Sequence, residues 1–251
     1  MLLISQDLTY YGMDTLRKPM ITDLVRQLSD SGLFPWIRLH YLFPSSFPAA
    51  LVDLMAERDN ICPYFDIPLQ HISDRILKSM KRGAGKQETL ALINLFREKI
   101  PHAAIRSSFI VGYPGETAAE YEELIDFIKE IRFDRVGVFT YSEEDGTPAA
   151  RLKDNIPAEE KQRRAARLME IQSEISLEKN QALTGKMLTV LIDRKENNFW
   201  VGRTRMDSPE VDNEVLIPLN TIETKPGNFE QIAIENAGIY ELYGSPVNRK
   251  V

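Results

Sequence analysis

Apolar residues along the chain fall into two alternating kinds of run. Short continuous apolar runs predict buried strands at residues 2–4, 36–39, 64–67, 105–111 and 136–139. Apolar positions spaced three and four apart predict intervening helices at residues 21–28, 48–55, 76–80, 90–96 and 117–131. Strands that alternate with helices in this way indicate a parallel sheet covered by helices, since parallel strands need a crossover connection.

The segment 117–131 carries the best-defined of these patterns. Thr117 and Glu120 form the spacing of a capping box, in which the two side chains bond each other's backbone N–H groups. An apolar stripe follows at Tyr121, Leu124, Ile125, Ile128 and Ile131. This stripe predicts a helix that lies on a sheet. Periodicity alone leaves two α/β architectures open, an open doubly wound sheet and a partial parallel (β/α) barrel.

The pattern changes near residue 184. A long charged helix is expected after Pro157, and it ends near Gly185. Short extended runs separated by Gly, Pro and Asn then follow at residues 188–192, 199–204, 215–217, 232–234 and 239–243. We therefore expect two domains, a parallel α/β domain with a trailing helix over residues 1–183 and a small antiparallel β-barrel over residues 184–251.

Composition narrows the possible functions. The chain has 251 residues with a formal net charge of -6, so its overall field gives no support for binding nucleic acid by charge alone. The single cysteine, Cys62, excludes a disulfide framework and any multi-cysteine metal or iron-sulfur site within the chain. No apolar run approaches the roughly 18 residues of a membrane span, and the first residues lack a leader pattern, so we expect a cytoplasmic protein without a membrane segment.

Polar side chains gather at the predicted strand ends. Gln6 and Asp7 follow the first strand, and Gln70 and His71 follow the third. Such residues face one another across the mouth of a barrel, although each one taken singly fits a cap or turn. The turn at Gly112 lies between a predicted strand and a predicted helix. Two interpretations fit this position: a ligand-binding loop, or an ordinary strand-to-helix connection. Residues 83–86 resemble part of a phosphate-binding loop, but they lack its earlier glycine and its Ser or Thr.

Five segments resemble a known family when they are taken in order. They are residues 5–12 (SQDLTYYG), 37–44 (IRLHYLFP), 65–74 (FDIPLQHISD), 109–117 (FIVGYPGET) and 139–149 (FTYSEEDGTPA). The chain resembles the radical-SAM methylthiotransferases, and within them the RimO-like branch, which modifies an aspartate of a small-subunit ribosomal protein. The resemblance implies a partial radical-SAM barrel followed by a TRAM-like β-domain.

The main alternative is the MiaB-like branch, which modifies adenosine in transfer RNA. That branch has a Ser-Gly-Ser type sequence where this chain has His71-Ile72-Ser73, and it is less acidic at the position of Glu143-Glu144-Asp145. Residues 184–251 contain eight Lys and Arg against ten Asp and Glu, which suits a basic ribosomal protein better than a phosphate backbone. The ribosomal protein is therefore the expected partner, with RNA bound through the TRAM-like domain as a second possibility.

The resemblance also implies S-adenosylmethionine and two 4Fe-4S clusters as cofactors of the parent protein. In the family, one cluster is held by a C-x3-C-x2-C loop and the other by an N-terminal domain, and this chain contains neither set of cysteines. We expect an N-terminally truncated chain that is inactive alone, with no metal-ligating residue and no catalytic residue assigned. A fragment that only binds a partner is the alternative from another class, and an unrelated barrel enzyme that uses carboxylates is a third.

By the same resemblance, six residues are expected to contact S-adenosylmethionine. Gln6 and Asp7 correspond to contacts with its amino group, and Gln70 corresponds to a contact with its ribose. Ser108, Ile110 and Gly112 correspond to the strand that lines its adenine. The chain departs from the family's G-x-I-x-G-x-x-E pattern, because Ser108 occupies the first glycine position and Glu116 comes one residue late.

Overall fold

The computed structural model describes residues 1–45 and 47–247, and these residues form two compact units. The first unit is Met1–Gln172, and the second is Ser173–Val251. The division falls inside one long helix, α6 (Ala158–Gln181). In the part of the chain so described, no helix has the length and apolar character needed to cross a membrane.

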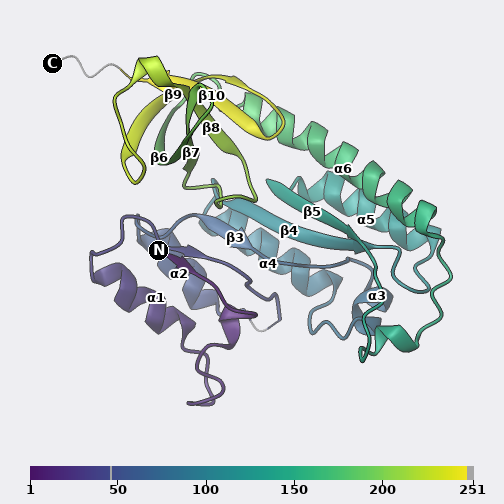
Figure 1. Ribbon diagram of the computed structural model, residues 1–251. Helices are drawn as coiled ribbons and strands as arrows, with labels where there is room; N and C mark the ends of the chain where they lie inside the picture. Colours follow the sequence, from purple (N-terminus) through teal and green to yellow (C-terminus); the bar gives the residue numbers. More distant parts are fainter. Residues whose placement is uncertain (46, 248–251) are drawn as a thin grey trace. The chain divides into compact units, whose positions relative to one another are not determined.

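The first unit contains five parallel strands arranged in chain order (Figure 1). They are β1 (Leu2–Leu3), β2 (Arg38–Leu39), β3 (Tyr64–Asp66), β4 (Ala104–Val111) and β5 (Arg135–Thr140). β1 pairs with β2, and β3, β4 and β5 form a second sheet. A parallel bridge between Ile37 and Ile61 joins the two sheets.

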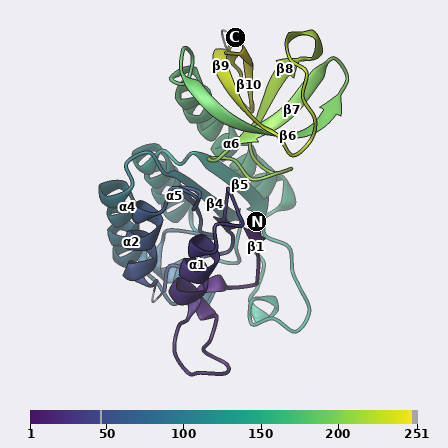
Figure 2. The ribbon, with the colours of Figure 1, turned by 90° about the vertical axis from the view of Figure 1, so that its left-hand side faces the viewer.

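Helices connect these strands. They are η1 (Leu8–Tyr10), α1 (Ile21–Asp30), α2 (Ala49–Glu57), α3 (Asp74–Ser79), α4 (Lys86–Lys99), α5 (Ala118–Ile131) and η2 (Ala149–Arg151). Figure 2 shows α2, α4 and α5 together on one side of the strands. A doubly wound sheet has helices on both faces and reverses its strand order, whereas a barrel keeps the order of the chain and carries its helices outside. The partial parallel barrel is therefore confirmed.

The two faces of β4 have different surroundings. Phe109 is fully buried on the helix side, where its ring meets Phe127 at 6.3 Å and Phe133 at 5.6 Å between centroids, both edge-on. Ile110, the next residue, points to the opposite face and pairs in register with Phe139 of β5. Phe139 is 58% exposed, so the face away from the helices is open at this end of the strands.

The predicted start of α5 is confirmed. The Thr117 hydroxyl accepts a hydrogen bond from the Glu120 N–H at 3.3 Å, and the Glu120 carboxylate accepts one from the Thr117 N–H at 2.9 Å. The predicted stripe is buried along its whole length. This helix therefore packs on the sheet as its spacing indicates.

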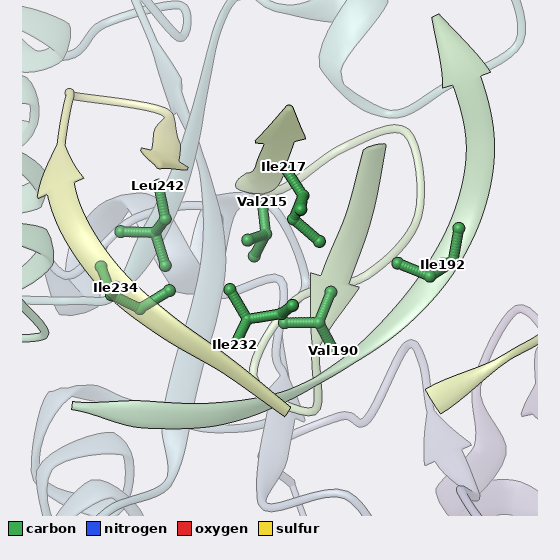
Figure 3. Packing of buried hydrophobic residues seen from close by; sticks show 7 residues of the cluster. All are labelled: Val190, Ile192, Val215, Ile217, Ile232, Ile234 and Leu242. Atoms are coloured by element: carbon green, nitrogen blue, oxygen red, sulfur yellow. The ribbon is translucent and has the colours of Figure 1, made fainter. Parts of the chain in front are cut away.

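The second unit is a closed five-stranded barrel in the order β10-β8-β7-β6-β9. Its elements are β6 (Met187–Glu196), β7 (Phe199–Thr204), β8 (Glu214–Pro218), η3 (Leu219–Thr221), β9 (Phe229–Ala237) and β10 (Glu241–Pro246). Seven apolar side chains from these strands point toward one another inside it (Figure 3), namely Val190, Ile192, Val215, Ile217, Ile232, Ile234 and Leu242. The predicted small β-barrel is confirmed.

One strand pair of this barrel differs from the expected antiparallel pairing. β10 runs parallel to β8, while the other four neighbouring pairs are antiparallel. An odd number of strands cannot alternate in direction all the way around a closed ring, so one parallel pair is required. The end of α6 belongs to this unit, because Asn180 donates to the carbonyls of Gly238 and Ile239 at 3.0 and 2.9 Å.

Candidate functional site

A pocket of about 450 Å³ lies at the carboxyl ends of β3, β4 and β5. Ligand sites of parallel barrels occupy this end, where the loops after the strands converge. Two of the residues expected at a cofactor site, Gln70 and Ile110, line it. Aromatic side chains form much of the wall, since Tyr113, Phe139 and Tyr141 are also lining residues.

Gln70 is held in an uncommon backbone conformation. Its φ of 71° lies in the left-handed region, which costs free energy for any residue with a Cβ. Two backbone hydrogen bonds secure it to β4: its N–H donates to the Ser108 carbonyl at 2.8 Å, and its carbonyl accepts from the Ile110 N–H at 2.8 Å. The chain therefore returns to the sheet after β3 ends, and this return places the Gln70 side chain in the pocket wall.

The remaining expected residues of β4 stand close to the pocket without lining it. Ser108 shares the open face of β4 with Ile110 and is half-buried. Gly112 is buried at the end of the strand with a φ of +72°, and its N–H donates to the Glu116 carboxylate at 2.7 Å. Gly112 therefore shapes the turn into Tyr113, which does reach the pocket.

Gln6 and Asp7 are not among the lining residues. Gln6 is exposed, and Asp7 is the N-cap of η1, where its carboxylate accepts from the Thr9 N–H at 2.8 Å and from the Thr9 hydroxyl at 2.5 Å. Asp7 still acts on the pocket through its charge. Burial lowers the pKa of the Arg82 guanidinium, and the negative charge of Asp7 opposes that shift.

Arg82 is a charged pocket residue that the sequence patterns did not identify. Its guanidinium is half-buried, lies 4.6 Å from the centre of the Phe43 ring and donates to the Pro68 carbonyl at 2.9 Å. Lys81, the residue before it, also lines the pocket. The only sequence signal was this basic pair after a short helix, beside the rejected phosphate-loop segment.

His71 is buried and does not line the pocket. Its side chain is fully buried, its Nδ1 accepts the Ser73 N–H at 2.9 Å, and its Nε2 lies 3.9 Å from the Glu116 carboxylate. Burial lowers the pKa of His71 to about 4. The imidazole is therefore neutral near pH 7, with its proton on Nε2, and its Nδ1 accepts a backbone N–H at the start of α3.

A set of polar contacts ties α3 to the start of α5. The Glu120 carboxylate accepts from the Ser73 hydroxyl at 2.9 Å and from the Arg75 guanidinium at 2.7 and 2.6 Å. Burial raises the pKa of Glu120, but hydrogen bonds from Arg75, Thr117 and Ser73 outweigh it and lower the pKa to about 2. Glu120 is thus a charged structural residue.

No metal centre emerges from residues 1–45 and 47–247, because no three His, Cys, Asp or Glu side chains gather there as a metal site. Cys62 is buried and precedes Pro63 at the start of β3. Iron-sulfur clusters are held by several cysteine thiolates, and the chain has one. The residues present therefore do not fit a 4Fe-4S cluster.

Two family models match the chain. The radical SAM superfamily matches residues 5–128, and the TRAM domain matches residues 184–247. The solved structure of coproporphyrinogen III oxidase from Escherichia coli, described as a radical SAM enzyme, aligns with a TM-score of 0.50 over 73% of this chain and 49% of its own. At 13% identity this likeness shows the fold alone.

Curated relatives match almost the whole chain. The ribosomal protein uS12 methylthiotransferase RimO of Christiangramia forsetii is 49% identical over 99% of this chain and 55% of its own length. Proteins of the same name from Chlorobium phaeobacteroides and Bacteroides thetaiotaomicron are 50% and 47% identical, over 96% and 98% of this chain and 55% and 57% of their own lengths. The chain thus spans little more than half the length of the curated relatives it matches.

Proposed function

The chain belongs to the RimO-like methylthiotransferases of the radical SAM superfamily, and from this membership we propose that it supplies the S-adenosylmethionine pocket and a partner-binding β-domain of such an enzyme. The reaction of the whole protein would add a methylthio group to an aspartate of a small-subunit ribosomal protein. Bound S-adenosylmethionine supplies radical chemistry when it meets a 4Fe-4S cluster. Since this chain has one cysteine, we propose that it does not perform the reaction alone.

One observation carries the proposal: the pocket at the strand ends combines aromatic walls with a half-buried guanidinium. Its volume of about 450 Å³ falls within the roughly 300–1,000 Å³ that is usual for small-molecule sites. S-adenosylmethionine carries a carboxylate, a ribose and an aromatic base. A guanidinium binds carboxylates strongly, and aromatic rings stack on bases, so the residues present fit this cofactor.

The proposed roles follow from the family resemblance and, for Arg82, from its place in the pocket wall. Arg82 would bind the carboxylate of the cofactor, and the Gln70 amide would bind its ribose hydroxyls. Ser108, Ile110 and Gly112 would line the adenine on the β4 side. Gln6 and Asp7 would lie toward the amino group, where the charge of Asp7 also balances that of Arg82.

Calorimetric titration of the chain with S-adenosylmethionine tests this assignment. We expect binding by the parent chain and an affinity about tenfold weaker in Arg82→Met, because a charge-assisted hydrogen bond contributes on the order of 1.5–3 kcal/mol. Lys99→Met is the matched control, since Lys99 forms an exposed pair with Asp53 on the helix side of the sheet. Failure of the parent chain to bind, or equal affinities in all three proteins, would contradict the proposal.

The proposed partner of the β-domain is a basic ribosomal protein. The curated relatives of the chain are named for the ribosomal protein uS12. Residues 184–251 contain more acidic than basic side chains, which suits a basic partner. Pull-down of the chain with a basic ribosomal protein and with transfer RNA across a salt series distinguishes the two partners. We expect retention of the protein; tight transfer-RNA binding that falls steeply with salt would instead support an RNA partner.

A further inference from the structure

Two buried side chains that do not line the pocket, Glu116 and Arg164, hold the turn at Gly112, which leads into the pocket residue Tyr113. We propose that Glu116 and Arg164 are positioning residues, which hold the turn at Gly112 and so preshape the pocket wall before a ligand binds. The identity of the ligand rests on the proposed function. The positioning itself is a property of the chain without ligand.

The Glu116 side chain binds the backbone of the turn that contains it. One oxygen of its fully buried carboxylate accepts from the N–H of Gly112 at 2.7 Å and from the N–H of Tyr113 at 3.2 Å. Its own N–H donates to the Tyr113 carbonyl at 2.8 Å. Two backbone donors at the end of β4 are thereby bound to a side chain of the same loop, which defines the direction in which the chain leaves the strand.

Gly112 makes this turn possible. Its φ of +72° favours glycine, and a Cβ added there would lie 2.3 Å from Cγ of Lys161. The stem of Lys161, in the first part of α6, thus packs on the turn where a side chain would stand. The Lys161 ammonium also donates to the Tyr141 carbonyl at 3.4 Å, so α6 contacts the loops after both β4 and β5.

Arg164 gives the Glu116 carboxylate its counter-charge. Its guanidinium, which is 8% exposed, donates to the second Glu116 oxygen at 2.5 Å and to the Glu160 carboxylate at 2.8 Å. The Tyr121 hydroxyl donates to the Arg164 carbonyl at 2.9 Å, which anchors this turn of α6 to α5. A buried carboxylate without a cation tends to take up a proton, and a protonated carboxyl is a poorer acceptor for two N–H groups. Arg164 therefore acts on the turn through Glu116.

The position of the turn determines where the aromatic wall stands. The Tyr113 hydroxyl lies 3.2 Å from the Ser79 hydroxyl, and the Tyr113 ring meets the Tyr141 ring edge-on at 5.4 Å. All three residues line the pocket. A wall that is already in place costs less ordering free energy when a ligand binds, and this gives the two buried residues an effect on affinity without contact with the ligand.

The same helix offers a matched control. Arg167 lies one turn after Arg164 on α6 and pairs with Glu122 of α5 at 2.6 Å, but both side chains are substantially exposed. An exposed pair of this kind contributes little to stability, and the Arg167 guanidinium donates to Glu122, which lies outside the Gly112 turn. Arg167→Met therefore removes an arginine between the same two helices without disturbing the turn.

Amide hydrogen exchange of Gly112 and Tyr113, measured by NMR on the ligand-free chain, tests the positioning. We expect exchange at both amides to be at least tenfold faster in Arg164→Met, intermediate in Arg164→Lys and unchanged in Arg167→Met. Should Arg164→Met fail to fold, the double variant Glu116→Gln/Arg164→Met removes both charges and keeps an acceptor oxygen; intermediate exchange is expected there. Parent-like exchange at both amides in the folded variant would overturn the proposal.

Affinity for S-adenosylmethionine supplies the second readout. We expect about tenfold weaker binding in Arg164→Met, less than twofold change in Arg167→Met and partial recovery in Arg164→Lys. Equal losses of affinity in Arg164→Met and Arg167→Met would mean that Glu116 and Arg164 only stabilise the fold. If the parent chain does not bind S-adenosylmethionine, the proposed function fails, while amide exchange still decides whether these residues position the turn.

Discussion

Among the single residues, His71 shows how burial determines the protonation state of a side chain in the first unit. Its pKa of about 4 lies below the 6.5 of a free imidazole, because the buried site does not solvate the charged form. Between these two values the unfolded chain binds a proton that the folded chain does not. His71 therefore makes the first unit less stable as the pH falls from 6.5 to 4, and it has no such effect above pH 6.5.

The expected contribution of His71 is about 2 to 3 kcal/mol of stability lost between pH 7 and pH 4.5. In His71→Asn this part of the pH dependence should disappear, although the variant is less stable at pH 7. Urea unfolding followed by the fluorescence of Trp36, with Trp200 replaced by Phe, reports on the first unit. The exposed His102, changed to Asn, is the control; an unaltered pH dependence in His71→Asn would contradict the assignment.

Single residues also show which parts of the pocket the sequence could predict and which it could not. Gln70 and Ile110 were expected at the cofactor site on the basis of family resemblance, and the structure places both in one pocket. Arg82 was not expected, because its position depends on contacts with the Phe43 ring and the Pro68 carbonyl. Both residues belong to earlier loops of the chain, outside the local pattern around Arg82. Local spacing carries no information on such a contact.

At the scale of elements, α5 is the clearest case of a helix determined by its own residues. Its cap, its apolar stripe and its packing face were all predictable, since each depends on neighbours within four positions. The turn before it was not. The left-handed Gly112 depends on Lys161 and Arg164 of α6, about 50 residues later in the chain.

Removal of the α5 cap has a defined expected cost. Thr117→Ala removes the hydroxyl that accepts the Glu120 N–H, and loss of an N-cap costs about 1 kcal/mol. The same Trp36 fluorescence measurement should show the first unit destabilised by that amount, while Thr15→Ala in an exposed loop changes stability by less than about 0.5 kcal/mol. Equal stabilities of the two variants would show that the cap does not support α5.

For the whole molecule, strand order decided between the two architectures that periodicity left open. Five parallel strands in chain order, with helices outside, make a partial barrel whose open face carries the pocket. The β-unit was predictable as a small barrel from its short alternating strands. Its single parallel pair, β8 with β10, follows from closure of five strands, which is a property of the ring and not of any one strand.

The central claim is that the pocket at the ends of β3, β4 and β5 binds S-adenosylmethionine. Backbone amide shifts of the chain, followed by NMR during titration with S-adenosylmethionine, test it most directly. We predict saturable shifts centred on Gln70, Arg82, Ile110 and Tyr113, with the strands of the β-unit unaffected. Shifts confined to residues 186–247, or none at saturating concentrations, would contradict the claim.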